Sequence, residues 1–376
     1  MQPYDVVIAG GGFSGLACAQ AAAIRGARVV VLDRNAKPGE KLHTTGLLVK
    51  EVADEFEFPE TSVRRIERVR LYSPNLNFLD LHSPGYYFLA TDTSKVLGFL
   101  AQQAKASGAQ IQWGSALRSL SPTKPGWRIN DALQSRYVVG CDGAKSRVAR
   151  LLNLGSNQSW LFGIESEFLN VRGLDPDCLH VLIDPILAPG YIGWVIPGCG
   201  FTQVGLAARY PHKPDLTLFL RKLSGLFDFS KAQVVETRAG FIPCGGAVHP
   251  LSIPGALLLG DAAGIVSPLT AGGIFPALKL GTAAGGVIAE HLLQAGPDPG
   301  MWLKKVIPSY LFKRGLRKVY DLCPPSSTQV DKLLRWRLFR SLAQVIFYHH
   351  RGLLTFKAWR DLLSLTLRSE GSGKIK

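Results

Sequence analysis

The first 33 residues alternate between short apolar runs and a glycine-rich turn. Residues 5–9 form a buried-strand pattern, and residues 27–32 form a second, β-branched run. The segment between them, residues 13–25, is rich in alanine and favours a helix. Two apolar strands joined by a helix should lie parallel, with a right-handed crossover. The chain is therefore predicted to begin with a strand–helix–strand unit.

A second group of elements follows before residue 158. Residues 63–81 alternate partly between apolar and polar positions and predict antiparallel strands with a turn at residues 73–75. A helix is predicted over residues 93–107, with Asp92 or Thr93 as its cap. Polar, glycine-rich residues 35–50 predict a loop, and short strands are expected at residues 109–113 and 136–141.

The sequence pattern changes at residue 158, where short apolar runs begin to alternate with Gly and Pro. Residues 158–237 predict a mostly antiparallel sheet with one helix near residues 216–225. A buried strand is expected at residues 256–260 and a long helix at residues 273–294, and beyond residue 300 the chain reads as helical, basic and aromatic.

Composition places the chain among well-folded globular proteins. Of its 376 residues 47% are hydrophobic and 19% charged, and this length predicts two or more lobes. The strand pattern begins almost at once, so no signal peptide is expected, and breakers interrupt every long apolar stretch, so no spanning helix is expected. These features favour a cytoplasmic protein. The six cysteines and eight histidines show no metal-ligand spacing, and no metal is expected.

The first motif is GxGxxG in residues 10–15, which follows a strand and opens a helix. In this pattern Gly10 allows the tight turn, Gly12 lets the backbone approach a pyrophosphate, and Gly15 lets the helix pack closely. Asp33 ends the second strand, where a carboxylate accepts hydrogen bonds from ribose hydroxyls. An acid there suits FAD or NAD rather than NADP. Arg34 is either an adenine-stacking residue or a solvated arginine.

Two further motifs decide between FAD and NAD. Residues 137–150 read YVVGCDGAKSRVAR, an apolar strand that ends in Asp-Gly, and residues 257–264 read LLLGDAAG, a strand that ends in Gly-Asp. In this order and spacing they resemble the DG and GD motifs of flavoproteins with the p-hydroxybenzoate hydroxylase fold. The resemblance implies FAD. Asp261 would accept a hydrogen bond from a ribityl hydroxyl, and the helix that begins near Gly272 would stabilise negative charge on the reduced flavin.

Within that fold the sequence resembles the geranylgeranyl reductase family. Residues 260–274, GDAAGIVSPLTAGGI, are similar to that family's segment around the flavin, and residues 191–198, YIGWVIPG, are similar to its Y-x-W-x-F-P motif. Two departures stand out. Residues 39–46 lack the cysteine that archaeal members place near the flavin, and residues 91–95 lack the arginine usual before the cofactor-side helix. The first departure argues against reduction of prenyl groups by the archaeal route.

The resemblance and the motifs together imply a set of site residues. Expected cofactor-binding residues are Gly10, Gly12, Phe13, Ser14, Gly15, Asp33, Arg34, Thr45, Gly46, Ala116, Asp142, Gly143, Gly260, Asp261, Ala262, Pro268, Ala271, Gly272, Gly273 and Ile274. Expected substrate residues are Tyr191, Trp194 and Pro197, although the first two could instead only pack a sheet. His43 is the candidate acid or base near the flavin, with a loop residue without a chemical task as the alternative.

The implied architecture is α/β, a Rossmann-like FAD-binding domain with an inserted antiparallel β substrate domain and C-terminal helices. The FAD-binding domain is expected to comprise residues 1–60, 88–157 and 250–300. The substrate domain is expected to comprise residues 61–87 and 158–249, followed by a basic helical segment, residues 301–376.

The basic segment carries most of the net charge. Residues 301–376 have a net charge of +12, and the rest of the chain has +3. Aromatic residues are interleaved with the cations, as in residues 333–340, LLRWRLFR. One reading is a helix at an anionic membrane surface, and the other is a helical subdomain with a solvated basic face. Nucleic acid is not expected, because no known binding module accompanies the charge.

The first functional hypothesis is a flavin reductase or dehydrogenase that acts on carbon–carbon double bonds of an isoprenoid or other lipid. Its electron donor is unspecified, and reducing equivalents would come from transiently bound NAD(P)H or from a redox protein. The alternatives are a monooxygenase of the same fold, and a flavin-binding protein held at a membrane without turnover.

Overall fold

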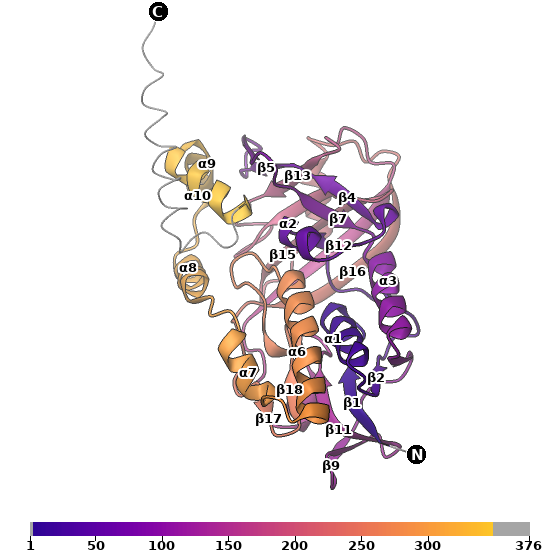
Figure 1. Ribbon diagram of the computed structural model, residues 1–376. Coiled ribbons are helices and arrows are strands. Elements are labelled where there is room, and N and C mark those ends of the chain that lie inside the picture. The colour runs from indigo at the N-terminus through magenta and orange to yellow at the C-terminus, as the bar shows by residue number, and fades with distance from the viewer. Residues whose placement is uncertain (1–2, 349–376) are drawn as a thin grey trace, which may run out of the picture. The chain divides into compact units, whose positions relative to one another are not determined.

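The computed structural model describes residues 3–348 and divides into two compact units (Figure 1). The first unit comprises Met1–Ser62, Thr91–Phe162 and Arg238–Val319, and the second comprises Val63–Ala90, Gly163–Thr237 and Tyr320–Lys376. The predicted C-terminal segment is thus divided between the two units. The His349–His350 pair and the aromatic residues Phe356 and Trp359 of that segment lie outside the described residues.

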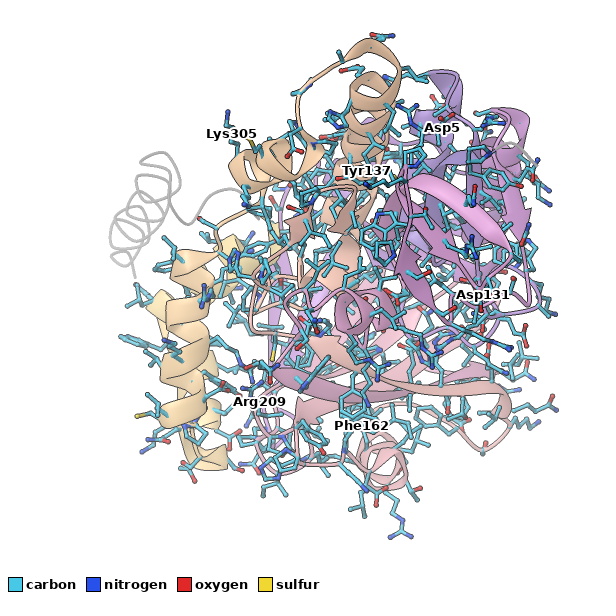
Figure 2. All side chains as sticks on the ribbon, turned by 90° about the horizontal axis from the view of Figure 1, so that it is seen from below. Asp5, Asp131, Tyr137, Phe162, Arg209 and Lys305 are labelled. Carbon is cyan, nitrogen blue, oxygen red and sulfur yellow. The ribbon has the colours of Figure 1, made fainter. Side chains whose placement is uncertain are left out.

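The first unit is built on a mainly parallel sheet with the strand order β17-β18-β11-β1-β2-β8. Strand β1 pairs in parallel with both β2 and β11, as the initial strand–helix–strand pattern predicts. The strands of this sheet are β1 (Tyr4–Ala9), β2 (Val29–Leu32), β8 (Gln110–Gln112), β11 (Leu133–Gly140), β17 (Ser252–Ile253) and β18 (Ala256–Leu258). Residues 6–9 of β1 and all of β2 are buried apolar runs. Asp5 on β1 and Tyr137 on β11 are labelled in Figure 2.

Two helices of the first unit pack against each other without room for side chains at the contact. These are α1 (Phe13–Ile24) and α6 (Ile274–Gln294), which run side by side in Figure 1. A Cβ added to Gly281 would lie 2.6 Å from the carbonyl oxygen of Ser14, and one on Gly285 would lie 2.3 Å from that of Cys18. Only glycine permits this backbone contact, which sets the position of one helix along the other.

The remaining elements of the first unit are short. They are β3 (Leu47–Leu48), α2 (Lys50–Glu55), η1 (Glu60–Ser62), α3 (Thr93–Ala106), β9 (Leu120–Pro122), β10 (Trp127–Ile129), α4 (Arg147–Leu151), η2 (Gly260–Ala263) and α7 (Pro299–Val306). Helix α3 begins where predicted, and the Asp92 side chain caps it by accepting from Lys95 N. Lys305 on α7 is exposed (Figure 2). The predicted loop 35–50 contains β3, and the β9–β10 hairpin was not predicted.

The second unit is built on a seven-stranded sheet with the order β16-β12-β15-β14-β13-β5-β6. The hairpin predicted over residues 63–81 is the antiparallel pair β5–β6, whereas β13 pairs with β5 in parallel. Its strands are β5 (Arg68–Tyr72), β6 (Phe78–His82), β12 (Trp160–Leu169), β13 (Cys178–Leu182), β14 (Gly193–Pro197), β15 (Thr202–Arg209) and β16 (Gln233–Pro243). Strands β12 and β16 each begin in one unit and end in the other. Two shorter strands are β4 (Val63–Ile66) and β7 (Phe88–Thr91).

Helix α5 (Leu216–Leu223) covers an apolar core on one face of this sheet. Asp184, which is 3% exposed, accepts from Lys222 Nζ at 2.6 Å and from the backbone N–H groups of Ile186 and Leu187. The buried carboxylate therefore ties α5 to the loop after β13, since a buried charge is tolerated when it is paired and hydrogen-bonded.

Basic helices complete the described part of the chain. They are α8 (Leu311–Leu322), α9 (Ser327–Arg335) and α10 (Arg337–Tyr348). Helix α9 starts with a capping box formed by Ser326 and Gln329. Helix α10 packs along β6, where the Tyr348 hydroxyl donates to the carbonyl of Leu81 at 2.8 Å.

A histidine is buried in the core of the second unit. His180 is 3% exposed, its Nδ1 lies 3.1 Å from the Tyr72 hydroxyl, and its ring meets that of Phe227 edge-on at 4.8 Å. Its Nε2 has no hydrogen-bond partner among the described residues. Burial, with help from the nearby positive charge of Arg70, lowers the pKa of His180 from 6.5 to about 4.

This histidine should make the protein sensitive to acid. The unfolded chain binds a proton at His180 below pH 6.5, whereas the folded chain does so only near pH 4, so stability falls as the pH falls. Between pH 7 and 5 the loss from this group is on the order of 2 kcal/mol. His180→Phe should flatten the pH dependence of urea unfolding relative to wild type. The exposed His82→Gln serves as the control, and an equal slope in wild type and His180→Phe would contradict the assignment.

Candidate functional site

The dinucleotide turn, residues 10–15, joins β1 to α1. Gly10 has φ +105°, and a Cβ there would lie 2.2 Å from the carbonyl oxygen of Cys141. A Cβ on Gly15 would lie 1.9 Å from the carbonyl oxygen of Gly10, whereas one on Gly12 would meet no atom within 4 Å. Gly12 is the N-cap of α1, and within residues 3–348 this helix has no side-chain cap. The turn therefore presents unobstructed backbone N–H groups, which is what binding of a pyrophosphate requires.

Asp33 is fixed beside this turn. Its Oδ2 accepts from Gly11 N and its Oδ1 accepts from Asn35 N, both at 2.7 Å. Ser115 N donates to the Asp33 carbonyl at 2.7 Å and so holds the loop that carries Ala116 next to it. This geometry places an acid and a loop backbone where the adenosine ribose would lie.

Trp113 is a neighbour of the dinucleotide turn that the sequence did not single out. Its ring lies 2.9 Å from the position that a Cβ on Gly11 would take. Gly11 therefore has to remain glycine for the indole to approach the turn. No motif surrounds Trp113, so only the fold reveals it.

Arg34 and His43 lie on exposed loops after β2. Arg34 Nη2 is 3.5 Å from His43 Nε2, and His43 Nδ1 is 2.9 Å from the carbonyl oxygen of Ala239. Because a carbonyl only accepts, Nδ1 is the protonated nitrogen, and Nε2 faces the guanidinium. Both ring nitrogens thus have protein contacts, and the role of His43 as an acid or base stays a prediction.

The loop that carries Thr45 and Gly46 is held against the start of α3. Gly46 has φ +73°, and its carbonyl oxygen accepts from Thr91 Oγ1 at 2.8 Å. A Cβ on Gly46 would lie 1.9 Å from Thr93 Oγ1. Threonines therefore occupy the space beside this loop, in the segment 91–95 that contains no arginine.

The DG turn, residues 141–146, follows β11. Asp142 Oδ1 accepts from Ser146 Oγ at 2.6 Å, and its Oδ2 accepts from Arg147 N at 2.6 Å and Val148 N at 3.1 Å. The carboxylate is therefore used to cap α4. Gly143 has φ +80°, and a Cβ there would meet no atom within 4 Å. Contact between this turn and a cofactor would fall to the backbone around Gly143.

The GD turn, residues 259–264, follows β18. Gly260 begins the 3-10 helix η2 with φ +56°, and Ala262 is buried behind it. Burial raises the pKa of Asp261 from its ordinary value to about 6, and no donor among the described residues offsets this effect. Asp261 thus presents a carboxylate with unused acceptor capacity, which suits a ribityl hydroxyl.

The GD turn leads through residues 265–273 to the start of α6. Ser267 Oγ accepts from Thr270 Oγ1 at 2.8 Å, and Ala271 has φ +53°. Gly273 is the N-cap of α6, and this helix has no side-chain cap among the residues that the structure describes. The first N–H groups of this 21-residue helix are therefore open to a ligand. Pro268, Gly272 and Ile274 belong to the same segment.

Asn157 links the two later turns, and sequence reasoning missed it. Its Nδ2 donates to the carbonyl of Ala144 at 3.0 Å and to the carbonyl of Asp261 at 2.9 Å. It is 9% exposed, and its Oδ1 lies 2.7 Å from the position of a Cβ on Gly264. One buried amide thus joins the DG and GD turns. An isolated asparagine outside both motifs gives no sequence signal for this role.

The expected substrate residues lie on or before β14 in the second unit. Trp194 Nε1 donates to Glu165 Oε2 at 2.5 Å, and a Cβ on Gly205 would lie 2.7 Å from the indole. Pro197 lies three positions further along the same strand, so it projects to the opposite face of the sheet. Trp194 and Pro197 therefore do not line the same face. Tyr191 is half-buried and precedes the strand.

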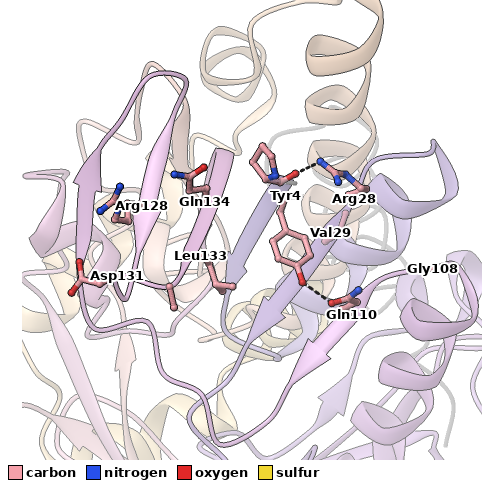
Figure 3. A pocket seen from close by; sticks show the side chains of 11 residues that line it. Tyr4, Arg28, Val29, Gly108, Gln110, Arg128, Asp131, Leu133 and Gln134 are labelled. Carbon is pink, nitrogen blue, oxygen red and sulfur yellow. Dashed lines mark hydrogen bonds between the residues drawn. The ribbon is translucent and has the colours of Figure 1, made fainter. Parts of the chain in front are cut away.

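A separate hollow of about 600 Å³ lies at the other end of the parallel sheet (Figure 3). It is lined by residues at the starts of the strands, among them Tyr4, Arg28 and Gln110, and the Tyr4 hydroxyl donates to Gln110 Oε1 at 2.6 Å. Dinucleotides in such sheets bind at the carboxyl ends of the strands. This hollow is therefore not the cofactor site.

Two kinds of feature are missing from residues 3–348. No three His, Cys, Asp or Glu side chains gather there in a way that could hold a metal ion. No helix in that range is both long enough and apolar enough to cross a bilayer.

Comparison with known proteins identifies residues 3–171 as an FAD binding domain. The chain is 25% identical over 305 residues to digeranylgeranylglycerophospholipid reductase of Methanocaldococcus jannaschii, covering 77% of this chain and 78% of the relative. It is 27% identical over 291 residues to geranylgeranyl diphosphate reductase of Rhodobacter capsulatus, covering 72% and 71%. The predicted use of FAD is confirmed.

A solved structure shows the same fold. It is a geranylgeranyl bacteriochlorophyll reductase-like protein from Thermoplasma acidophilum, with a TM-score of 0.80 and 21% sequence identity. The match covers 97% of this chain and 100% of that one. The predicted fold class, a Rossmann-like FAD-binding domain with an inserted antiparallel sheet, is confirmed.

Loss of the Asp261 carboxylate should abolish flavin retention. Asp261→Ala removes the free acceptor at the GD turn but no protein hydrogen bond of that side chain, so the variant should fold and purify without colour. Circular dichroism and visible flavin absorbance report the two properties separately. Asp261→Asn keeps an acceptor and should retain part of the flavin. A yellow Asp261→Ala protein would show that this carboxylate does not contact the cofactor.

Proposed function

We propose that this chain, a member of the geranylgeranyl reductase family of FAD-dependent oxidoreductases, reduces carbon–carbon double bonds in the isoprenoid part of a lipid-like substrate. Bound FAD would supply a hydride at its N5 position, and a proton would complete the addition to each double bond. The observation that carries the proposal is the GD turn, where the free carboxylate of Asp261 precedes the uncapped start of α6.

The residues of the first unit would bind and tune the cofactor. Backbone N–H groups of the dinucleotide turn would hold the pyrophosphate, and Asp33 would hold the adenosine ribose. The uncapped N-terminus of α6 would stabilise negative charge on the pyrimidine edge of the flavin ring. Preorganised N–H groups lower the cost of reducing the ring, because they need no rearrangement when the charge appears.

Trp194 is the substrate residue that we favour among the three expected ones. Its indole is held in one orientation by the hydrogen bond to the buried carboxylate of Glu165 and by contact with Gly205. A rigid aromatic surface suits an apolar isoprenoid chain, which offers no hydrogen bonds of its own. Tyr191 and Pro197 complete the proposed set. Pro197 would contact the substrate from the opposite face of the sheet or at the end of β14.

The proposed proton donor is His43, which would have to leave its contact with the Ala239 carbonyl to act. The proposed electron source is NAD(P)H that binds transiently or a separate redox protein. Turnover of a His43→Asn variant and the dependence of flavin reduction on each donor test these two assignments. Full turnover by His43→Asn would remove the histidine from the mechanism.

The decisive experiment incubates the purified holoenzyme with geranylgeranyl diphosphate under anaerobic conditions and a chemical reductant. Mass spectrometry should show a product that gains two hydrogens for each double bond reduced, because hydride and proton add across it. Asp261→Ala serves as the cofactor-free control. Substrate-dependent oxygen consumption with an oxygenated product would instead identify a monooxygenase. A holoenzyme that no donor reduces would identify a flavin-binding protein without turnover.

We also propose that the corner between α9 and α10 contacts an anionic membrane surface. Trp336 and Leu338 are 56% and 44% exposed there, and the exposed cations Lys332 and Arg335 flank them. Exposed apolar side chains among cations are typical of segments at the bilayer interface. A peripheral location would give the protein access to a lipid substrate.

Vesicle co-sedimentation tests this contact. The protein should bind vesicles that contain phosphatidylglycerol more strongly than phosphatidylcholine vesicles, and Trp336→Ala should weaken binding by roughly tenfold. Leu338→Ala tests the corner, and Leu218→Ala is its matched control, because Leu218 lies on α5 and has a similar exposed fraction of 46%. Equal binding by Trp336→Ala and wild type would contradict the proposal.

A further inference from the structure

The start of α8 carries three side chains that can donate hydrogen bonds. Tyr310 directly precedes the helix and is half-buried, with φ +45°. Lys313 Nζ lies 6.0 Å from the centre of the Tyr310 ring, and Arg314 follows on the next position of the helix. A bulky residue in the left-handed region is uncommon and needs surrounding structure to hold it. The backbone here thus fixes a phenol next to the Lys313 ammonium group.

Neither cation has a partner of opposite charge in the part of the chain that the structure describes. Within residues 3–348, no carboxylate lies within ion-pair distance of Lys313 or Arg314, and Glu51 on α2 acts on Lys313 only from further away. Lys313 is half-buried, and burial lowers its pKa. An ammonium group withdrawn from water without a partner is costly unless an anion compensates it. The missing compensation is what a bound anion would provide.

Close backbone contacts connect these side chains to the flavin site. Arg314 Cδ lies 3.3 Å from the position that a Cβ on Gly246 would take. The carbonyl oxygen of Gly246 lies 2.5 Å from the corresponding position on Gly264, the residue that ends the GD turn. All of these residues belong to the first unit. A ligand held by Arg314 would therefore lie one loop away from the turn that carries Asp261.

We infer that Tyr310, Lys313 and Arg314 bind the phosphate or diphosphate group of the substrate. A phenol, an ammonium and a guanidinium together supply the donors and the positive charge that phosphate oxygens require, and arginine matches their spacing with two parallel donors. This inference rests on the proposed function, since it assigns the head group of the same isoprenoid substrate. The 2′-phosphate of NADPH has the same chemistry, and the experiment separates the two sources.

The test compares Lys313→Gln with Lys318→Gln. Lys318 lies on the same helix, is exposed and likewise has no ion-pair partner within residues 3–348, so its loss controls for net charge. Lys313→Gln should lower kcat/KM for geranylgeranyl diphosphate by roughly ten- to a hundredfold, because a charge-assisted hydrogen bond is lost. It should leave kcat/KM for geranylgeraniol, which lacks the diphosphate, unchanged. Lys318→Gln should change neither value by more than about twofold.

Binding of inorganic pyrophosphate, measured by calorimetry, separates this inference from the proposed function. Wild type should bind it, and Lys313→Gln and Tyr310→Phe should bind it more weakly while retaining flavin colour. If wild type binds pyrophosphate but reduces no prenyl substrate, the anion site stands and the proposed function fails. If Lys313→Gln matches wild type in pyrophosphate binding and in kcat/KM, the inference is overturned. A loss confined to NADPH, with NADH and the diphosphate unaffected, would overturn the substrate assignment and identify the nucleotide phosphate as the ligand.

Discussion

The cofactor site depends on the direct backbone contact between α1 and α6. Gly281 and Gly285 let α6 approach the carbonyl oxygens of Ser14 and Cys18 more closely than any side chain would allow. The N-terminus of α1 lies at the dinucleotide turn, and the N-terminus of α6 follows the GD turn. The same contact therefore sets the spacing between the proposed pyrophosphate site at α1 and the proposed flavin-ring site at α6. A bulkier residue at either glycine would disturb both.

The electrostatics of the site come from the partial positive charges at two helix N-termini and from three aspartates. Neither α1 nor α6 has an acid in its first turn, and each has a glycine as its N-cap, so within residues 3–348 the nearest acids, Asp33 and Asp261, lie at the turns before the helices. Asp33 is oriented by two backbone N–H groups, whereas Asp142 is consumed in capping α4. Of these three, only Asp261 has a carboxylate that accepts no hydrogen bond from a described residue. Similar acids at strand ends thus serve three different tasks.

The elements that could be predicted from the sequence are those with a local sequence pattern. The glycine turn, the strand-ending acids and the long helix at residues 274–294 each leave a short pattern that folding preserves. It did not reach Asn157, whose partners Ala144 and Asp261 are 13 and 104 residues away, or Trp113, which meets Gly11 only after the sheet forms. Strand alternation also places Trp194 and Pro197, which belong to one motif, on opposite faces of the sheet. The missed features are contacts between distant segments, which no periodicity records.

The absence of side-chain caps on α1 and α6 also matters for the protein without its cofactor. Each helix begins with several N–H groups that only water or a ligand can satisfy. A ligand that binds the folded chain and not the unfolded one raises stability in proportion to the logarithm of its concentration. The vitamin precursor of the flavin would then control how much of this protein survives quality control in the cell. Starvation for riboflavin should deplete the polypeptide itself, as well as its activity.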